Sequence, residues 1–99
     1  SIMGVNNEVG SIQPLHEIGE MLKLLEHIFF HVDFVQGIGK IPLALNENAI
    51  DLLTFSGHKF HALRGTGILF KRKNVHLHSE ILGGGQEMGY RSGTENLAG

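Results

Sequence analysis

The fold is decided by Ile50-Asp51-Leu52-Leu53-Thr54-Phe55-Ser56-Gly57-His58-Lys59, a stretch near the middle of a chain of 99 residues. Its apolar run with a single charge predicts a buried strand. The strand ends at Ser56-Gly57, a pair that turns easily. A lysine at the end of a buried strand is poorly solvated, which disfavours the ammonium form and favours a free amine. We therefore interpret Lys59 as an amine able to attack a carbonyl, against the general expectation that a lysine is exposed at the surface.

Strand and helix signals alternate on either side of this stretch. Further strands are predicted at residues 2–5, 28–33 and 66–71, where short apolar runs are bounded by glycine or polar residues. Leucine and isoleucine recur at helical spacing over residues 15–25, after Pro14, which fits the first turn of a helix. The alternation predicts an α/β fold with a mostly parallel sheet and flanking helices.

Two histidines beyond the predicted strand at residues 66–71 have a spacing that could bind a metal ion. His76 and His78 alternate with apolar residues, which predicts a half-buried strand over residues 75–78. A His-x-His pair can hold a metal ion, but no third ligand lies nearby in the sequence. Structural histidines are the commoner case, so we predict no metal site.

Composition excludes several classes of function. The apolar fraction of 41% and the charged fraction of 18% are ordinary for a soluble globular chain. The formal net charge of -2 gives no basic surface for nucleic acid, and no apolar run approaches the roughly 18 to 20 residues of a membrane-spanning helix. The absence of cysteine excludes disulfides and cysteine nucleophiles within the chain. Strand residues follow Ser1 at once and no signal peptide is visible, so we expect a segment of a longer, cytoplasmic protein.

Polar residues follow three of the predicted strands. Asn7 follows the first, Asp33 ends the second with Gln36 just beyond it, and Lys59 follows the third. In an open α/β sheet, ligands bind at the carboxyl ends of the strands, so these groups are expected around one crevice. A lysine for a Schiff base and an acid to keep a pyridinium nitrogen protonated are what pyridoxal 5'-phosphate (PLP) requires. The residues therefore favour PLP chemistry.

A glycine-rich tail offers a second kind of ligand contact. Residues 83–96 combine glycines with an arginine, a serine and a threonine. Glycines let a backbone approach an anion closely, and these side chains donate to phosphate oxygens. The tail fits neither the P-loop nor the dinucleotide fingerprint, and a flexible loop is the alternative interpretation.

Four motifs together resemble the cysteine desulfurases of the NifS-like group, in the class-V aminotransferase family, from one end of the chain to the other. They are Val5-Asn6-Asn7-Glu8-Val9-Gly10 with Gln13-Pro14, His31-Val32-Asp33 with Gln36, Asp51-Leu52 with Ser56-Gly57-His58-Lys59, and Gly83-Gly84-Gly85-Gln86-Glu87 with Arg91-Ser92-Gly93-Thr94-Glu95-Asn96. The resemblance implies the type I (aspartate aminotransferase-like) PLP fold, with residues 1–99 forming a segment of its cofactor-binding large domain. It also implies a homodimer that takes sulfur from L-cysteine, leaving alanine, for iron–sulfur clusters or for thiolated tRNA and cofactors. Sulfur-acceptor or scaffold proteins are the implied partners.

The resemblance also implies a role for each matched residue. Lys59 would bond to the cofactor and act as a base at the substrate Cα, with His58 beside it as the second catalytic residue. Asp33 would pair with the pyridinium nitrogen and Gln36 with the phenolic oxygen. The remaining cofactor contacts would come from Asn7, Ser56, Gly57, His58 and Thr94, with Thr94 reaching the phosphate in the neighbouring subunit.

The chain departs from the family pattern in three respects. The cysteine that accepts sulfur, the arginine for the substrate carboxylate and the ring-stacking histidine are expected outside residues 1–99, so the chain alone is expected not to complete a turnover. Phe34 stands where alanine is common, and a phenyl group on the cofactor face would overpack it. Ala62-Leu63-Arg64-Gly65 replaces Gly-Pro-Lys-Gly, and alanine would be strained if position 62 needs a positive φ.

Two other interpretations remain open. The first is a non-catalytic remnant that keeps the fold and a PLP-binding or dimerisation surface. The second is another PLP lyase of the same fold, such as a selenocysteine lyase. The loop that would separate cysteine from selenocysteine specificity lies outside the matched motifs.

Overall fold

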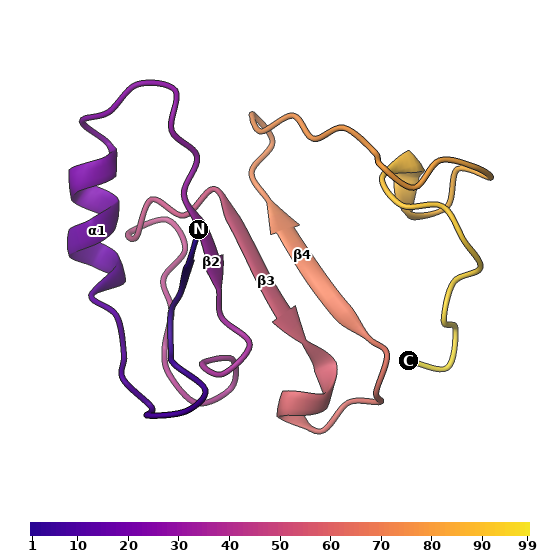
Figure 1. Ribbon diagram of the computed structural model, residues 1–99, viewed down its shortest axis with the longest axis horizontal. Coiled ribbons are helices and arrows are strands. Elements are labelled where there is room, and N and C mark those ends of the chain that lie inside the picture. The colour runs from indigo at the N-terminus through magenta and orange to yellow at the C-terminus, as the bar shows by residue number, and fades with distance from the viewer.

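The chain forms one four-stranded sheet, seen in a computed structural model that describes all of residues 1–99. The strands lie side by side in chain order: β1 (Ile2–Met3), β2 (His31–Asp33), β3 (Leu52–Ser56) and β4 (Gly67–Lys71) (Figure 1). The first three strands are parallel and β4 runs antiparallel to β3. The sheet is therefore mixed but mostly parallel, which confirms the predicted α/β class.

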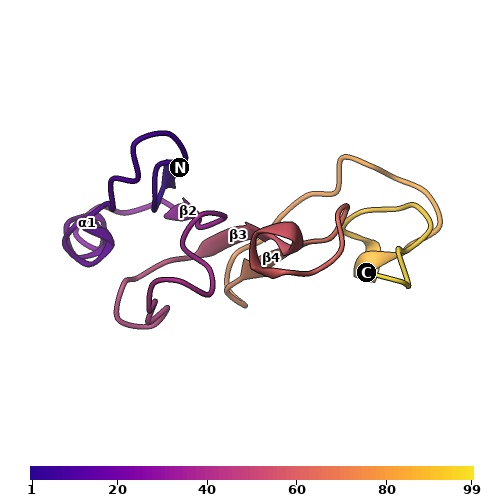
Figure 2. The same cartoon turned by 90° about the horizontal axis from the view of Figure 1, so that it is seen from below.

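One α-helix and two short 3-10 helices complete the secondary structure. The helix α1 (Leu15–Leu22) connects β1 to β2, and η1 (Gly57–Phe60) follows β3 directly. The third, η2 (Glu87–Gly89), lies in the C-terminal tail. Figure 2 shows α1 and this tail at opposite ends of the molecule. No helix is long and apolar enough to cross a lipid bilayer.

The core lies on one face of the sheet. In β2 the burial alternates, with Val32 fully buried between the half-buried His31 and Asp33. Val32 pairs in register with Leu53 of β3, and both belong to the same buried cluster as Leu15 of α1. Because side chains alternate across a strand, His31 and Asp33 project from the opposite face of the sheet.

Several predicted elements are shorter in the structure. The helix expected over residues 15–25 ends at Leu22, and the strand expected over 28–33 begins only at His31. Phe29, which was expected in this strand, precedes it and is 55% exposed. The strand predicted at 75–78 is wrong, because this segment has no regular structure and both of its histidines are exposed.

A polar network closes the end of the sheet where β3 begins. Arg72 donates from Nε to the Ile50 carbonyl at 2.7 Å and from Nη2 to the Leu45 carbonyl at 3.0 Å. The Asp51 carboxylate accepts from the backbone N–H of Phe30 at 2.8 Å and lies 3.9 Å from Arg72 Nε. These contacts hold the entry of β3 against its neighbours, at the end opposite to Lys59.

Candidate functional site

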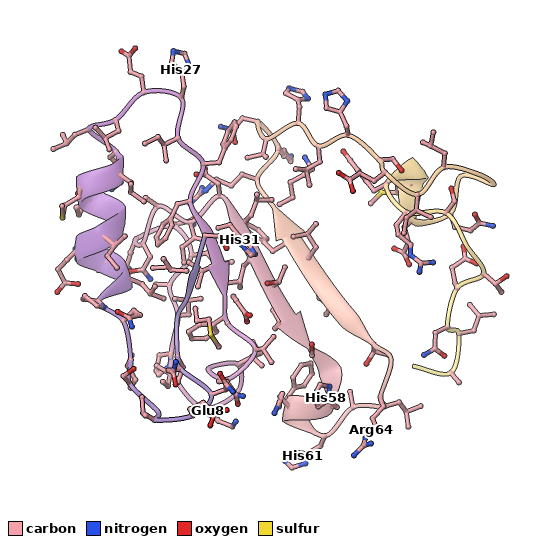
Figure 3. All side chains as sticks on the ribbon, in the orientation of Figure 1. Glu8, His27, His31, His58, His61 and Arg64 are labelled. Atoms are coloured by element: carbon pink, nitrogen blue, oxygen red, sulfur yellow. The ribbon has the colours of Figure 1, made fainter.

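The carboxyl ends of β2 and β3 bring the predicted site residues to one edge of the sheet. Asp33 is the last residue of β2 and pairs in register with Thr54, two residues before β3 ends at Ser56. The ladder continues past β2, because the Phe34 N–H donates to the Thr54 carbonyl at 2.8 Å. Figure 3 shows Glu8, from the loop after β1, at the same end of the sheet as His58. The topology thus gathers the segments that follow the three parallel strands.

Lys59 lies in η1, immediately beyond β3, and is half-buried. Lys23, Lys40 and Lys71 each donate a hydrogen bond within the chain, whereas the Lys59 amine has no such partner. An unpaired, partly shielded amine is available for a covalent bond to a ligand carbonyl.

Close packing of Gly57 fixes where η1 begins. The Gly57 N–H donates to the Thr66 carbonyl at 3.0 Å, and its carbonyl accepts from the Ala62 N–H at 3.1 Å. A Cβ placed on Gly57 would collide with the Thr66 hydroxyl. A glycine at this position therefore lets the segment carrying Lys59 lie tightly against the start of β4.

The Asp33 carboxylate has one oxygen engaged and one free. Oδ1 accepts the Val35 backbone N–H at 3.0 Å, which closes a local turn after β2. Oδ2 has no hydrogen-bond partner in the chain, and the residue is only half-buried. The carboxylate is thus oriented by its own backbone while keeping one oxygen available for a cationic N–H.

The remaining predicted contacts fall into two groups. Gln36, in the turn after β2, and Ser56 are half-buried, while His58 is exposed; none of the three side chains is hydrogen-bonded to the chain. Asn7 is exposed in the turn after β1 and donates to Glu8 Oε1 at 2.9 Å.

Thr94 shares a groove with one other predicted site residue, Gly57. Thr94 is exposed in the tail, and the groove, of about 1200 Å³, lies between β4 and the tail. Neither Asp33 nor Lys59 lines this groove, nor do they line the second cavity, of about 350 Å³, beside α1.

The structure corrects two expectations about departures from the family pattern. Phe34 does not lie on the cofactor face, because its side chain is 2% exposed and belongs to the core on the other face of the sheet. The positive φ after the lysine falls on His61, at 72°, and not on Ala62. Neither Phe34 nor Ala62 therefore obstructs the site.

Sequence reasoning missed a histidine on the same face as Asp33. His31 contacts the Thr54 hydroxyl through Nε2 at 3.1 Å and the Ser1 hydroxyl through Nδ1 at 2.7 Å. The two-residue spacing of His31 and Asp33 on one strand was the available signal, since it places both side chains on one face.

The residues present fit PLP. The cofactor needs an amine, an acid for the ring nitrogen and donors for the phosphate and phenolic oxygens. Lys59 and the free Asp33 oxygen supply the first two, and the unpaired side chains of Ser56, His58 and Gln36 supply donors. A group carrying an aldehyde, a basic ring nitrogen and a phosphate matches this set.

Comparisons with known proteins agree with this chemistry. A family model described as aminotransferase class-V matches residues 1–99. The chain is 54% identical over 99 residues to a NifS/IcsS protein homolog from Lactobacillus delbrueckii subsp. bulgaricus, covering 99% of this chain and 26% of that protein. It is 50% identical to a cysteine desulfurase from Nostoc sp., covering 100% of this chain and 24% of the relative.

Solved structures show the same similarity. A NifS-like protein superposes with a TM-score of 0.88 at 48% identity, over 95% of this chain and 26% of its own. A structure described as SspA in complex with cysteine superposes with a TM-score of 0.87 at 40% identity, over 95% of this chain and 27% of its own. The chain thus spans about a quarter of the length of the proteins it matches.

Proposed function

The chain belongs to the class-V aminotransferase family, and on that premise we propose that it supplies the cofactor-lysine region of a PLP-dependent cysteine desulfurase. The proposed reaction converts L-cysteine to L-alanine and passes the sulfur to a cysteine thiolate. Since the chain contains no cysteine, that thiolate belongs to another polypeptide segment or partner. Residues 1–99 are proposed to form part of the cofactor-binding large domain of the type I fold.

Each predicted site residue at the edge of the sheet has a proposed task. The Lys59 amine would hold the cofactor through its aldehyde, and as a free amine it would take the proton from the substrate Cα. Asp33 Oδ2 would accept the N–H of the pyridinium ring, Gln36 would donate to the phenolic oxygen, and Asn7 would contact the ring. Ser56 and His58 would bind the phosphate, and Gly57 would let the backbone that carries Lys59 lie close to the cofactor. When bound, PLP withdraws electrons from the substrate Cα, and a protonated ring nitrogen makes it a stronger acceptor.

One observation carries the proposal: the Lys59 amine and Asp33 Oδ2 both have no hydrogen-bond partner in the chain, and they lie at the carboxyl ends of neighbouring parallel strands. No buried side-chain nitrogen or oxygen in the chain lacks a partner, so both of these groups reach solvent and are accessible to a ligand. The relatives named as cysteine desulfurases support the choice of this chemistry.

The proposal extends to the assembly in which the chain works. Thr94 lies in the C-terminal tail and lines a groove that Asp33 does not line, which suits a contact to a cofactor in a second subunit. We therefore propose a homodimer, in the cytoplasm, that transfers sulfur to an acceptor or scaffold protein. No direct contact with nucleic acid is proposed.

Reductive trapping tests the central step. The chain is mixed with PLP, reduced with borohydride and mapped by peptide mass spectrometry. We expect the pyridoxyl label at Lys59, abolished by Lys59→Ala and unaffected by Lys73→Ala, which removes an exposed lysine that also lacks a partner. Equal labelling of all lysines, or no label, would contradict PLP binding; the absence of label would favour the non-catalytic remnant.

A further inference from the structure

A histidine bridges two strands on the face of the sheet that carries Asp33. His31 Nε2 lies 3.1 Å from Thr54 Oγ1, and the contact is partly buried. On its other side, Nδ1 lies 2.7 Å from the Ser1 hydroxyl. Figure 3 shows His31 over the middle of the sheet, away from His58 and His61 at its edge. The imidazole is therefore held at both nitrogens.

The bridge lies directly beside the acid. His31 and Asp33 are two residues apart on β2 and so share a face. Thr54 pairs in register with Asp33, which places its side chain next to the carboxylate on that same face. Thr54 is thus hydrogen-bonded to His31 and is also the neighbour of Asp33 on the adjacent strand.

A hydroxyl beside a free carboxylate oxygen has more than one orientation available. Thr54 Oγ1 has one proton and two lone pairs, and the imidazole contact fixes which way the side chain turns. Without His31, the Thr54 side chain is free to change rotamer and to turn its hydroxyl toward Asp33 Oδ2. That would engage the oxygen which the proposed function assigns to the ring nitrogen.

We propose that His31 is a positioning residue that keeps Thr54 turned away from Asp33, so that Asp33 Oδ2 stays available to the cofactor. The inference rests on the proposed function, because it concerns how the acid is kept ready for a ligand. His31 itself touches neither the cofactor nor the substrate. It acts through one hydrogen bond, from the imidazole to the threonine.

Side-chain isosteres separate this role from simple packing. The amide nitrogen of glutamine reaches the place of the histidine Nε2, and that of asparagine reaches the place of Nδ1. His31→Gln therefore keeps the Thr54 contact and loses the Ser1 contact, whereas His31→Asn does the reverse. Thr54→Ser keeps the hydroxyl and Thr54→Val removes it with almost no change in shape.

The experiment measures PLP binding to the full chain by absorbance titration, with circular dichroism melts of every variant. We expect His31→Leu and His31→Asn to raise the Kd for PLP about two- to tenfold and to shift the absorbance maximum of the bound cofactor. His31→Gln should retain wild-type values. His78→Leu, at an exposed histidine without hydrogen bonds, is the matched control and should change neither quantity.

Double variants at His31 and Thr54 make the test more specific. If the imidazole acts only by restraining the hydroxyl, Thr54→Val removes what His31 restrains, so His31→Leu should lose its effect in that background. Thr54→Ser should leave the His31→Leu effect in place. An undiminished effect of His31→Leu in the Thr54→Val background would overturn the proposal.

Two further results would count against it. Equal Kd values for His31→Gln and His31→Asn, or losses that follow the melting temperature of each variant, would assign His31 to packing alone. If the wild-type chain itself binds no PLP, the proposed function fails and the inference falls with it. Wild-type binding with unaffected His31 variants would refute the positioning role alone.

Discussion

The ring of Phe34 lies so close to Gly4 that a Cβ placed on this glycine would stand 2.7 Å from the ring carbon Cδ2. Gly37 faces the same ring and would clash with it in the same way. Phe34 thus fills the space that two missing side chains leave open between the loops after β1 and β2. A residue that the sequence alone places against the cofactor is instead a central part of the core.

Replacing Phe34 with alanine should destabilise the chain strongly. The side chain is 2% exposed, and emptying such a site removes transfer free energy and leaves a cavity. We expect the free energy of unfolding, measured by urea titration, to fall by about 3 to 5 kcal/mol. Phe29→Ala, at a phenylalanine that is 55% exposed, should cost well under half as much. Similar losses for both variants would contradict the placement of Phe34 in the core.

The fit between Phe34 and Gly37 gives a second, independent prediction. Gly37→Ala should destabilise the chain by about 1 to 3 kcal/mol, because its Cβ would overlap the ring. In a Phe34→Leu background the added methyl has more room, so the double variant should lose less than the sum of the two single losses. Strict additivity in the urea titrations would show that the two residues do not compete for the same space.

The sequence predicted the sheet well where apolar runs are strong and bounded. β3 and β4 fall within one or two residues of their predicted positions, and the mostly parallel order follows from the alternating pattern. The predicted strand at 75–78 failed because alternation alone does not make a strand, which also needs a partner for its backbone hydrogen bonds. The helix over 15–25 was too long because the α-helical bonds end near Leu22. Beyond it, Leu24 and Leu25 donate to the carbonyls three residues back, Met21 and Leu22, which makes turns although Leu25 continues the helical spacing.

The candidate site was likewise predictable only in part from the sequence. The positions of Asp33 and Lys59 were predictable because Asp33 ends β2 and Lys59 follows β3, and parallel strands end at one edge of a sheet. The bridge from His31 to Thr54 was not predictable, because it joins residues 23 positions apart and depends on the register between β2 and β3, which no local pattern specifies. Phe34 lies two residues after the buried Val32 of β2. Because side chains alternate along a strand, both lie on the same side of the sheet.

Arg72 should be the most sensitive of the basic residues near the end of β4. Its guanidinium donates to two backbone carbonyls and is 29% exposed, so its loss leaves acceptors at Leu45 and Ile50 without partners. We expect Arg72→Ala to lower the free energy of unfolding by about 2 to 3 kcal/mol. The exposed neighbour Lys73 is the control, and Lys73→Ala should change the urea midpoint little. Equal midpoints for the two variants would exclude a bracing role for Arg72.

The pair formed by Glu20 and Lys23 on α1 gives a test of acid sensitivity. The side-chain hydrogen bond from Lys23 lowers the pKa of Glu20. A carboxylate whose pKa is lower in the folded state stabilises the fold above its unfolded pKa, and this contribution is lost as the pH falls through the folded value. Lys23→Met should raise the pKa of Glu20 in an NMR titration, whereas Lys40→Met should not. An unchanged pKa in Lys23→Met would show that the hydrogen bond does not form in solution.

Asp33→Asn should separate the two tasks of this side chain. The amide oxygen can still accept the Val35 N–H, so the turn after β2 and the urea midpoint should be nearly unchanged. The amide nitrogen replaces the free oxygen and presents a donor, without charge, to the ring nitrogen of PLP. Because a hydrogen bond to a charged group contributes about 1.5 to 3 kcal/mol, the Kd for PLP should rise about 10- to 100-fold in an absorbance titration. Glu95→Gln, at an exposed carboxylate in the tail, should bind as the wild type does. Wild-type affinity in Asp33→Asn would show that Asp33 does not hold the cofactor ring.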